Sequence, residues 1–102
     1  MGAIEDIAAE RRRQVEAEGW TPEHDDQHAT GELACAAGCY AIHAGLPDRA
    51  RVPKGYAPQD WPWSVSWWKP KDRRRDLIRA AALIVAEIER LDRATVAGGP
   101  TP

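Results

Sequence analysis

The chain has 102 residues, of which 43% are hydrophobic and 29% charged, and its formal net charge at pH 7 is −2. This length allows one domain with one modest core. The charge balance gives no general attraction to nucleic acid or to an anionic membrane, and no apolar run is long enough to span a bilayer. Because the N-terminus lacks an apolar signal region, we expect a cytoplasmic protein without a membrane partner.

The first predicted element is a helix over residues 3–18. Four residues would form its apolar side: Ile4, Ile7, Ala8 and Val15. Gly19 is expected to end this helix as a left-handed cap, with Trp20 folding back on it. Thr21 then suits an N-cap and Pro22 the first position of a single helical turn.

Polar residues cluster in the stretch EHDDQH, which contains His24, Asp25, Asp26 and His28 and is soon followed by Glu32. Imidazole and carboxylate groups are ligands for metals and agents of acid–base catalysis. The same residue types before a helix also serve as caps and local hydrogen-bonding groups. Both interpretations stay open, with the structural one favoured.

A second helix is predicted over residues 31–44, ending at Gly45. Its alanine content and low charge predict a central helix buried on two sides. The residues expected on these two sides are Leu33, Ala37 and Tyr40, and Cys35, Cys39 and Ile42.

The two cysteines stand four residues apart on this helix, a spacing with poor disulfide geometry. His43 continues the same ridge, but eight helical residues rise about 12 Å, too far for one zinc ion to reach all three side chains. We therefore expect Cys35 and Cys39 to be small buried thiols.

Residues 46–69 form a long connection rich in proline and tryptophan. Connections of this length are usually functional or disordered, and the tryptophans argue against disorder. Trp61 and Trp63 flank Pro62 and are expected on one side, either in the core or as a platform for a flat ligand. Trp67 and Trp68 are adjacent, so at least one of them should face away from what the other packs on.

The third helix is predicted from Pro70 to Asp92, followed by a mobile tail at residues 94–102. Residues 1–93 would then form the single helical domain. Its apolar stripe is expected at steps of four and three: Leu77, Ala81, Ile84, Ile88 and Leu91. Arg75, Arg79 and Arg90 fall on the side expected to face solvent.

Cations gather at the start of the third helix: Lys69, Lys71 and residues 73–75, which are all arginine. Positive charge at this end opposes the helix dipole, so a carboxylate or a bound anion should offset it. Asp72 and Asp76 would supply the first explanation. The second is a phosphate-binding helix start, which beside aromatic faces fits a nucleotide-like ligand.

Several motifs carry a resemblance to known families: ERRRQVEAEGWTPEHDD, GELACAAGCYA, WPW, and WWKPKDRRRDLIRAAALIVAEIERLDR. Over residues 10–93 the chain resembles a recurrent uncharacterised module of tailed-phage and prophage proteins. More loosely, it is similar to the ryanodine-receptor-type repeat domain, some bacterial versions of which are suspected of binding nucleotide-derived ligands. That second resemblance implies a pocket formed by Trp20, the Trp61–Trp63 segment and the start of the third helix.

These observations predict a small all-α domain of three main helices with the Trp- and Pro-rich connection packed over them. The leading functional hypothesis is a phage-type, non-enzymatic binding protein that holds a nucleotide-derived small molecule and sequesters a host immune signal. The predicted ligand-binding residues are Trp61, Trp63 and Trp68 for stacking, Lys69, Lys71, Arg74 and Arg75 for phosphate, and Trp20, His24, Asp26 and His28 around them.

Two alternatives stay open, and no catalytic residue, metal or cofactor is assigned. An exposed tryptophan patch would suit an inhibitor or adaptor that docks on a host protein. A metal-dependent nucleotide hydrolase is the other, because Glu89 and Asp92 resemble half of the acidic pattern of all-α nucleotide pyrophosphohydrolases. The sequence also allows a homo-oligomer, whereas a nucleic-acid partner does not fit its net charge.

Overall fold

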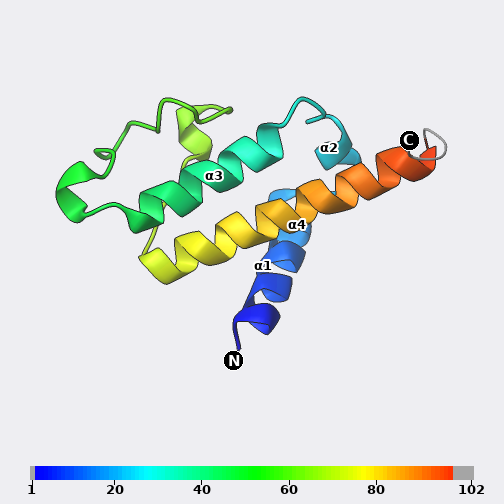
Figure 1. Ribbon diagram of the computed structural model, residues 1–102, viewed down its shortest axis with the longest axis horizontal. Coiled ribbons are helices and arrows are strands. Elements are labelled where there is room, and N and C mark those ends of the chain that lie inside the picture. The colour runs from blue at the N-terminus through cyan, green and yellow to red at the C-terminus, as the bar shows by residue number, and fades with distance from the viewer. Residues whose placement is uncertain (1, 98–102) are drawn as a thin grey trace.

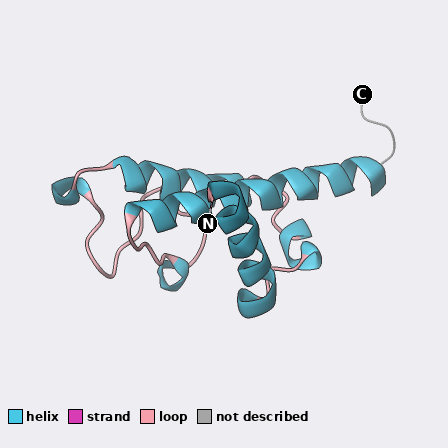
Figure 2. Cartoon of the chain, turned by 90° about the horizontal axis from the view of Figure 1, so that it is seen from below, coloured by secondary structure: helices cyan, strands magenta, loops and turns pink. Residues whose placement is uncertain are grey.

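The computed structural model describes residues 2–97, which fold into one all-α domain, confirming the predicted fold class. Its helices are α1 (Ala3–Glu18), α2 (Pro22–Asp26), α3 (Glu32–Gly45) and α4 (Arg73–Ala97), with single 3₁₀ turns at Asp48–Ala50 and Val65–Trp67. No strand occurs among the residues described (Figure 2).

Helix α4 is the element on which the others pack. Its 25 residues span about 37 Å, most of the 48 Å length of the molecule. Helix α3 lies along α4, α1 crosses it at a steep angle, and α2 packs near its C-terminal half (Figure 1). The connection from α3 to α4 folds back beside α3 and carries four of the five tryptophans.

The caps predicted around α1 and α2 are confirmed. Gly19 has a φ of 74°, and its N–H and that of Trp20 both donate to the carbonyl of Gln14, the latter at 2.9 Å, so a left-handed glycine ends α1. The hydroxyl of Thr21 accepts from the N–H of His24 at 3.3 Å, and Pro22 opens α2. These two caps fix the direction in which the chain leaves α1.

Helix α4 begins later and ends later than predicted. Its start is set by Asp72, whose carboxylate accepts from the N–H of Arg75 at 2.9 Å, and not by Pro70. Asp76 reaches back and accepts from the N–H of Lys71 at 2.7 Å. The helix continues to Ala97, so residues 94–97 of the expected tail are helical, and residues 98–102 lie outside the described part.

The core lies between α3 and α4 and is closed by tryptophans from the connection. Tyr40 stacks on Trp68, with ring centroids 4.6 Å apart, and meets the ring of Trp61 edge-on at 5.6 Å. The indole N–H of Trp61 donates to the carbonyl of Ser64 at 3.0 Å. Leu33 and Leu83 are fully buried in the same cluster. Half of the tryptophan-rich segment is therefore core.

The predicted buried face of α4 is wrong. The large members of the expected stripe lie 47–52% exposed, namely Leu77, Ile84, Ile88 and Leu91. The helix instead buries a neighbouring stripe that includes Ala80, Leu83 and Ala86, because small residues allow the alanine-rich α3 to approach closely.

Two arginines expected in solvent are buried with this stripe. Arg79 donates to the hydroxyl of Tyr40 at 3.4 Å and to the carbonyl of Lys69. Arg90 donates to Glu87 at 2.7 Å. These bonds offset much of the cost of burying the guanidinium groups, although the buried Nε of Arg79 has no hydrogen-bond partner among the described residues and lies 3.9 Å from the carboxylate of Glu10.

Helix α1 is likewise rotated from its predicted orientation. Ile4 is 75% exposed, whereas Glu10 and Gln14 are buried. Arg13 donates to Glu10 at 2.8 Å, and Arg75 of α4 makes a second ion pair with the same carboxylate. Burial raises the pKa of Glu10, but the hydrogen bond and charge of Arg13 and the charges of Arg75 and Arg79 lower it further, to a net value below its ordinary one.

The expected two-sided burial of α3 holds for one side only. Leu33, Ala37 and Tyr40 are buried as predicted. On the other side Cys39 is buried but Cys35 and Ile42 are exposed. The expectation of two buried thiols is therefore wrong for Cys35.

Candidate functional site: an aromatic pocket

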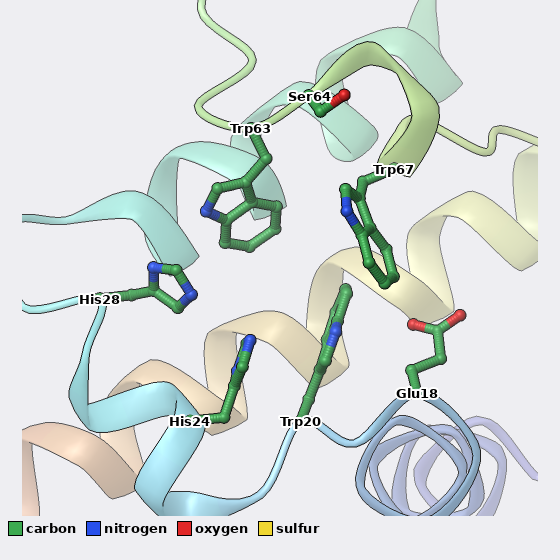
Figure 3. A pocket seen from close by; sticks show the side chains of 7 residues that line it. All are labelled: Glu18, Trp20, His24, His28, Trp63, Ser64 and Trp67. Atoms are coloured by element: carbon green, nitrogen blue, oxygen red, sulfur yellow. The ribbon is translucent and has the colours of Figure 1, made fainter.

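An aromatic pocket of about 420 Å³ opens where the end of α1, α2 and the tryptophan-rich segment meet (Figure 3). Its volume lies in the usual range for small-molecule sites. Seven residues line it: Glu18, Trp20, His24, His28, Trp63, Ser64 and Trp67. Five of these seven side chains are aromatic rings, so the pocket can offer flat apolar surfaces to a ligand.

One wall comes from the chain just after α1. The left-handed turn at Gly19 directs Trp20 against His24, whose ring is parallel to the indole within 1° at a centroid distance of 6.2 Å. His28 follows one helical turn later, and its ring lies 4.8 Å from that of His24. The predicted caps at Gly19 and Thr21 therefore position three of the pocket rings.

The facing wall comes from the tryptophan-rich segment. Trp63 lies 5.7 Å from Trp20 and 5.2 Å from His28, and Trp67 lies 6.1 Å from Trp20. The 3₁₀ turn between them is capped by Ser64, whose hydroxyl accepts from the N–H of Ser66 at 3.4 Å. Figure 3 shows Trp63 and Trp67 projecting from this turn toward the rings below.

The two tryptophans of the facing wall are more exposed than the core tryptophans, whereas Trp20 is only 9% exposed and belongs to the core cluster as well as to the pocket lining. Trp67 is 42% exposed and Trp63 is partly buried, whereas Trp61 and Trp68 are each 8% exposed. The indole nitrogen of Trp63 is buried and has no hydrogen-bond partner among the described residues. An unpaired buried donor costs about 1–3 kcal/mol, so this wall retains an unmet hydrogen bond.

Few full charges border the pocket. Glu18 supplies a carboxylate, which accepts from Arg13 at 3.3 Å. The ammonium group of Lys69 lies over the ring of Trp67, 5.1 Å from its centroid, within cation–π range.

The hydrogen bond from the hydroxyl of Thr30 lowers the pKa of Glu32 to about 2. The ionised Glu32 carboxylate lies 3.5 Å from the Nδ1 of His28 and orients that ring.

Four of the predicted ligand-binding residues line this pocket: Trp20, His24, His28 and Trp63. Lys69 borders it through Trp67. Trp61 and Trp68 lie in the core and do not line this pocket, and Trp68 instead borders a second hollow together with Tyr56 and Lys69. The two tryptophans of the connection that can stack on a ligand in this pocket are therefore Trp63 and Trp67, and not Trp61 and Trp63 as expected.

The remaining predicted binding residues lie elsewhere, and the side chains of Arg74, Arg75 and Asp26 are paired within the protein. Arg74 bonds Asp6 at 2.6 Å, and Arg75 bonds Glu10, so both arginines join α1 to α4. Asp26 bonds Arg93 at 2.8 Å. The backbone of Lys71 belongs to the cap of α4, away from the pocket lining.

Asp25, the other acidic residue of the EHDDQH stretch, is fully buried. Its carboxylate bonds Arg11 at 2.6 Å, so it anchors α2 to α1. This agrees with the structural interpretation of the stretch for its carboxylates, whereas its two histidines face the pocket. Among residues 2–97, no group of three or more His, Cys, Asp or Glu side chains has an arrangement that could hold a metal ion.

Sequence reasoning missed three lining residues: Glu18, Ser64 and Trp67. The adjacency of Trp67 and Trp68 indicated that one of them must turn outward, and Trp67 is that residue. Glu18 and Ser64 carry no signal in the sequence, because their position depends on how α1 and the 3₁₀ turn approach each other.

Comparison of the chain with protein-family models, curated proteins and solved structures found no match. Within the described part of the chain, no helix combines the length and apolar character needed to cross a membrane.

Proposed function

We propose that the protein binds a nucleotide-derived small molecule in the aromatic pocket and holds it without converting it. The observation that carries the proposal is the division of the tryptophans: Trp61 and Trp68 fill the core, while Trp63 and the 42% exposed Trp67 border a hollow. Leaving large indole faces open to solvent forgoes the stabilisation that burying them would give. A ligand that covers these faces recovers it.

The ring chemistry of the pocket favours a flat heteroaromatic group. Stacking a base on an aromatic side chain is worth about 1–3 kcal/mol and tolerates any base. The unpaired indole N–H of Trp63 offers a donor to a ring nitrogen or carbonyl after a small side-chain shift. The nitrogens of His24 and His28 offer further polar contacts to the edge of the base.

A phosphate group would find fewer cations than the sequence predicted. Arg74 and Arg75 are committed to Asp6 and Glu10. Of the predicted cationic set, Lys69 is the member that borders the pocket, since its ammonium group lies over the outer pocket residue Trp67. We therefore propose that stacking supplies most of the affinity and that Lys69 supplies the phosphate contact.

We further propose a biological role in which the protein sequesters a nucleotide-derived signal of host immunity. This part rests on the resemblance of residues 10–93 to a phage and prophage module. A binding protein suits such a role because removing a signal requires affinity and no turnover.

The test begins with thermal melting of the protein against mononucleotides, cyclic dinucleotides and ADP-ribose derivatives, since a tight ligand raises stability by mass action. Calorimetric titration of the best ligand would then compare Trp67→Ala with the matched control Tyr56→Ala, which truncates an exposed aromatic residue outside this pocket. We expect Trp67→Ala to weaken binding by about 5- to 150-fold, the equivalent of about 1–3 kcal/mol. Equal affinities of the two variants would refute the proposal.

The adaptor hypothesis has one specific observation in its favour. Val65, two residues before Trp67 on the same 3₁₀ turn, is 47% exposed yet does not line the pocket. A docking protein would cover both Val65 and Trp67, whereas a small ligand in the pocket would contact Trp67 and leave Val65 exposed. Val65→Ser therefore separates the two: unchanged ligand affinity supports the small-molecule proposal, and loss of a protein partner without ligand binding supports the adaptor.

A further inference from the structure

Helix α4 carries an apolar face that nothing in the described chain covers. The face consists of Leu77, Ala81, Ile84, Ile88 and Leu91, and the four large members are each about half exposed. Helix α3 packs against the side of α4 that contains Leu83 and Ala86, and α1 packs against the side that contains Arg75. The exposed stripe is a third side, free along about 21 Å of helix.

The spacing of these residues identifies the kind of surface that would cover them. Steps of four, three, four and three are the a and d positions of a heptad repeat. Such a seam packs knobs-into-holes against another helix with the same repeat. No other described helix of this chain presents an exposed stripe with that repeat, so the complementary surface is α4 of a second copy.

We propose that two copies of the chain associate through the exposed seam of α4, with the two helices antiparallel. In a dimer with two-fold symmetry, each copy contributes the same surface, so the seam of one copy packs against the identical seam of the other. The small side chain of Ala81, the second residue of the seam, allows the two backbones to approach closely there.

The direction follows from the charges at the two ends of α4. Arg73 and Arg74 are exposed at its start, where Arg74 also pairs with Asp6, and Glu89 and Asp92 are exposed near its end, where Glu89 also pairs with Arg11. A parallel pair would bring arginine beside arginine and carboxylate beside carboxylate. An antiparallel pair brings the basic end of each helix beside the acidic end of the other and also opposes the helix dipoles.

This inference is independent of the proposed ligand, because no residue of α4 lines the aromatic pocket. Failure of one proposal therefore leaves the other intact. A seam variant should keep its ligand affinity, and a pocket variant should keep its oligomeric state.

The test is sedimentation equilibrium of the full chain over a range of micromolar concentrations. We expect a reversible dimer for the wild type and a monomer for Ile84→Glu and for Leu91→Glu. Ile42→Glu is the matched control, because Ile42 is 69% exposed but lies on α3, away from the seam. Unchanged helical circular dichroism in all three variants would show that the fold survives.

A monomeric wild type would overturn the proposal and leave the seam to a different protein, and so would a dimer that persists in both seam variants. Direction is tested by oxidising a mixture of Arg74→Cys and Asp92→Cys chains, each also carrying Cys35→Ser to remove the exposed thiol. Disulfides between the two variants support the antiparallel pair. Disulfides only within each variant contradict it.

Discussion

Truncating Trp61 should reduce the stability of the fold, whereas truncating Trp67 should mainly reduce ligand affinity, although the two residues are only six positions apart in one segment. Trp61 is 8% exposed, meets Trp63 and Trp68 at centroid distances of 5.4 and 5.0 Å, and bonds the carbonyl of Ser64. Replacing such a side chain with alanine removes apolar burial and leaves a cavity, at a cost of about 3–5 kcal/mol. Native domains typically have about 5–15 kcal/mol of stability, so such a loss is a large part of it.

Trp67 is 42% exposed, so solvent fills the space that its truncation leaves and no cavity term applies. We expect Trp67→Ala to cost about 2 kcal/mol or less from lost burial alone. In the folded protein this variant should lose ligand affinity, whereas Trp61→Ala should melt at least about 12 °C lower than the wild type.

The assay is urea unfolding followed by helical circular dichroism, because tryptophan fluorescence changes with the substitution itself. The slope of the free energy of unfolding against urea should stay the same, so that the midpoint reports stability. Tyr56→Ala serves as the control and should stay within about 0.5 kcal/mol of the wild type. Equal costs for Trp61→Ala and Trp67→Ala would refute the division into core and pocket tryptophans.

Three further outcomes follow from the geometry. Gly19→Val should destabilise by more than about 1 kcal/mol, because a β-branched residue cannot relax at a φ of 74°. Gly38→Ala should stabilise by about 0.5–1 kcal/mol, because Gly38 is inside α3 and an added Cβ meets nothing within 4 Å; urea unfolding checks both. The lowered pKa of Glu10 contributes stability above its ordinary pKa of 4.5, which is lost as pH falls through the folded value. Acid unfolding should therefore be less steep below pH 4.5 in Glu10→Gln, and identical profiles for the two proteins would contradict this role.

Local chemistry made much of the secondary structure predictable. Gly19 and Thr21 act through the backbone of their own turns, so their caps could be recognised without knowing the fold. The start of α4 was misjudged because Pro70 and Asp72 both suit a helix start, and only the carboxylate of Asp72 bonds the first turn.

The faces of α1 and α4 were not predictable from their periodicity. The spacing of apolar residues identifies a helix face that is expected to be buried, but it does not show whether that face packs against the same chain or against another molecule. The stripe through Ile84 is exposed to solvent. Glu10 of α1 and Arg79 of α4 are buried because they form an ion pair across the contact between the two helices. Such reciprocal ion pairs are a property of the packed helices, and no single helix reveals them.

The aromatic pocket was half predictable for a related reason. The sequence placed Trp20, His24 and His28 together because they are neighbours in the chain. Which tryptophan of the connection would face them depends on the 3₁₀ turn capped by Ser64, which turns Trp67 outward and Trp68 into the core. Positions set by the meeting of distant segments remained beyond sequence reasoning.

The central claim is that a ligand occupies the aromatic pocket, and the indole N–H signals of the five tryptophans test it most directly. We would record them by ¹H–¹⁵N correlation spectroscopy while titrating the best nucleotide-derived ligand of the thermal screen. We predict large shifts for Trp20, Trp63 and Trp67, which line the pocket, and small ones for Trp61 and Trp68, which do not. Shifts confined to Trp61 and Trp68, or no shift with any member of the panel, would contradict the claim.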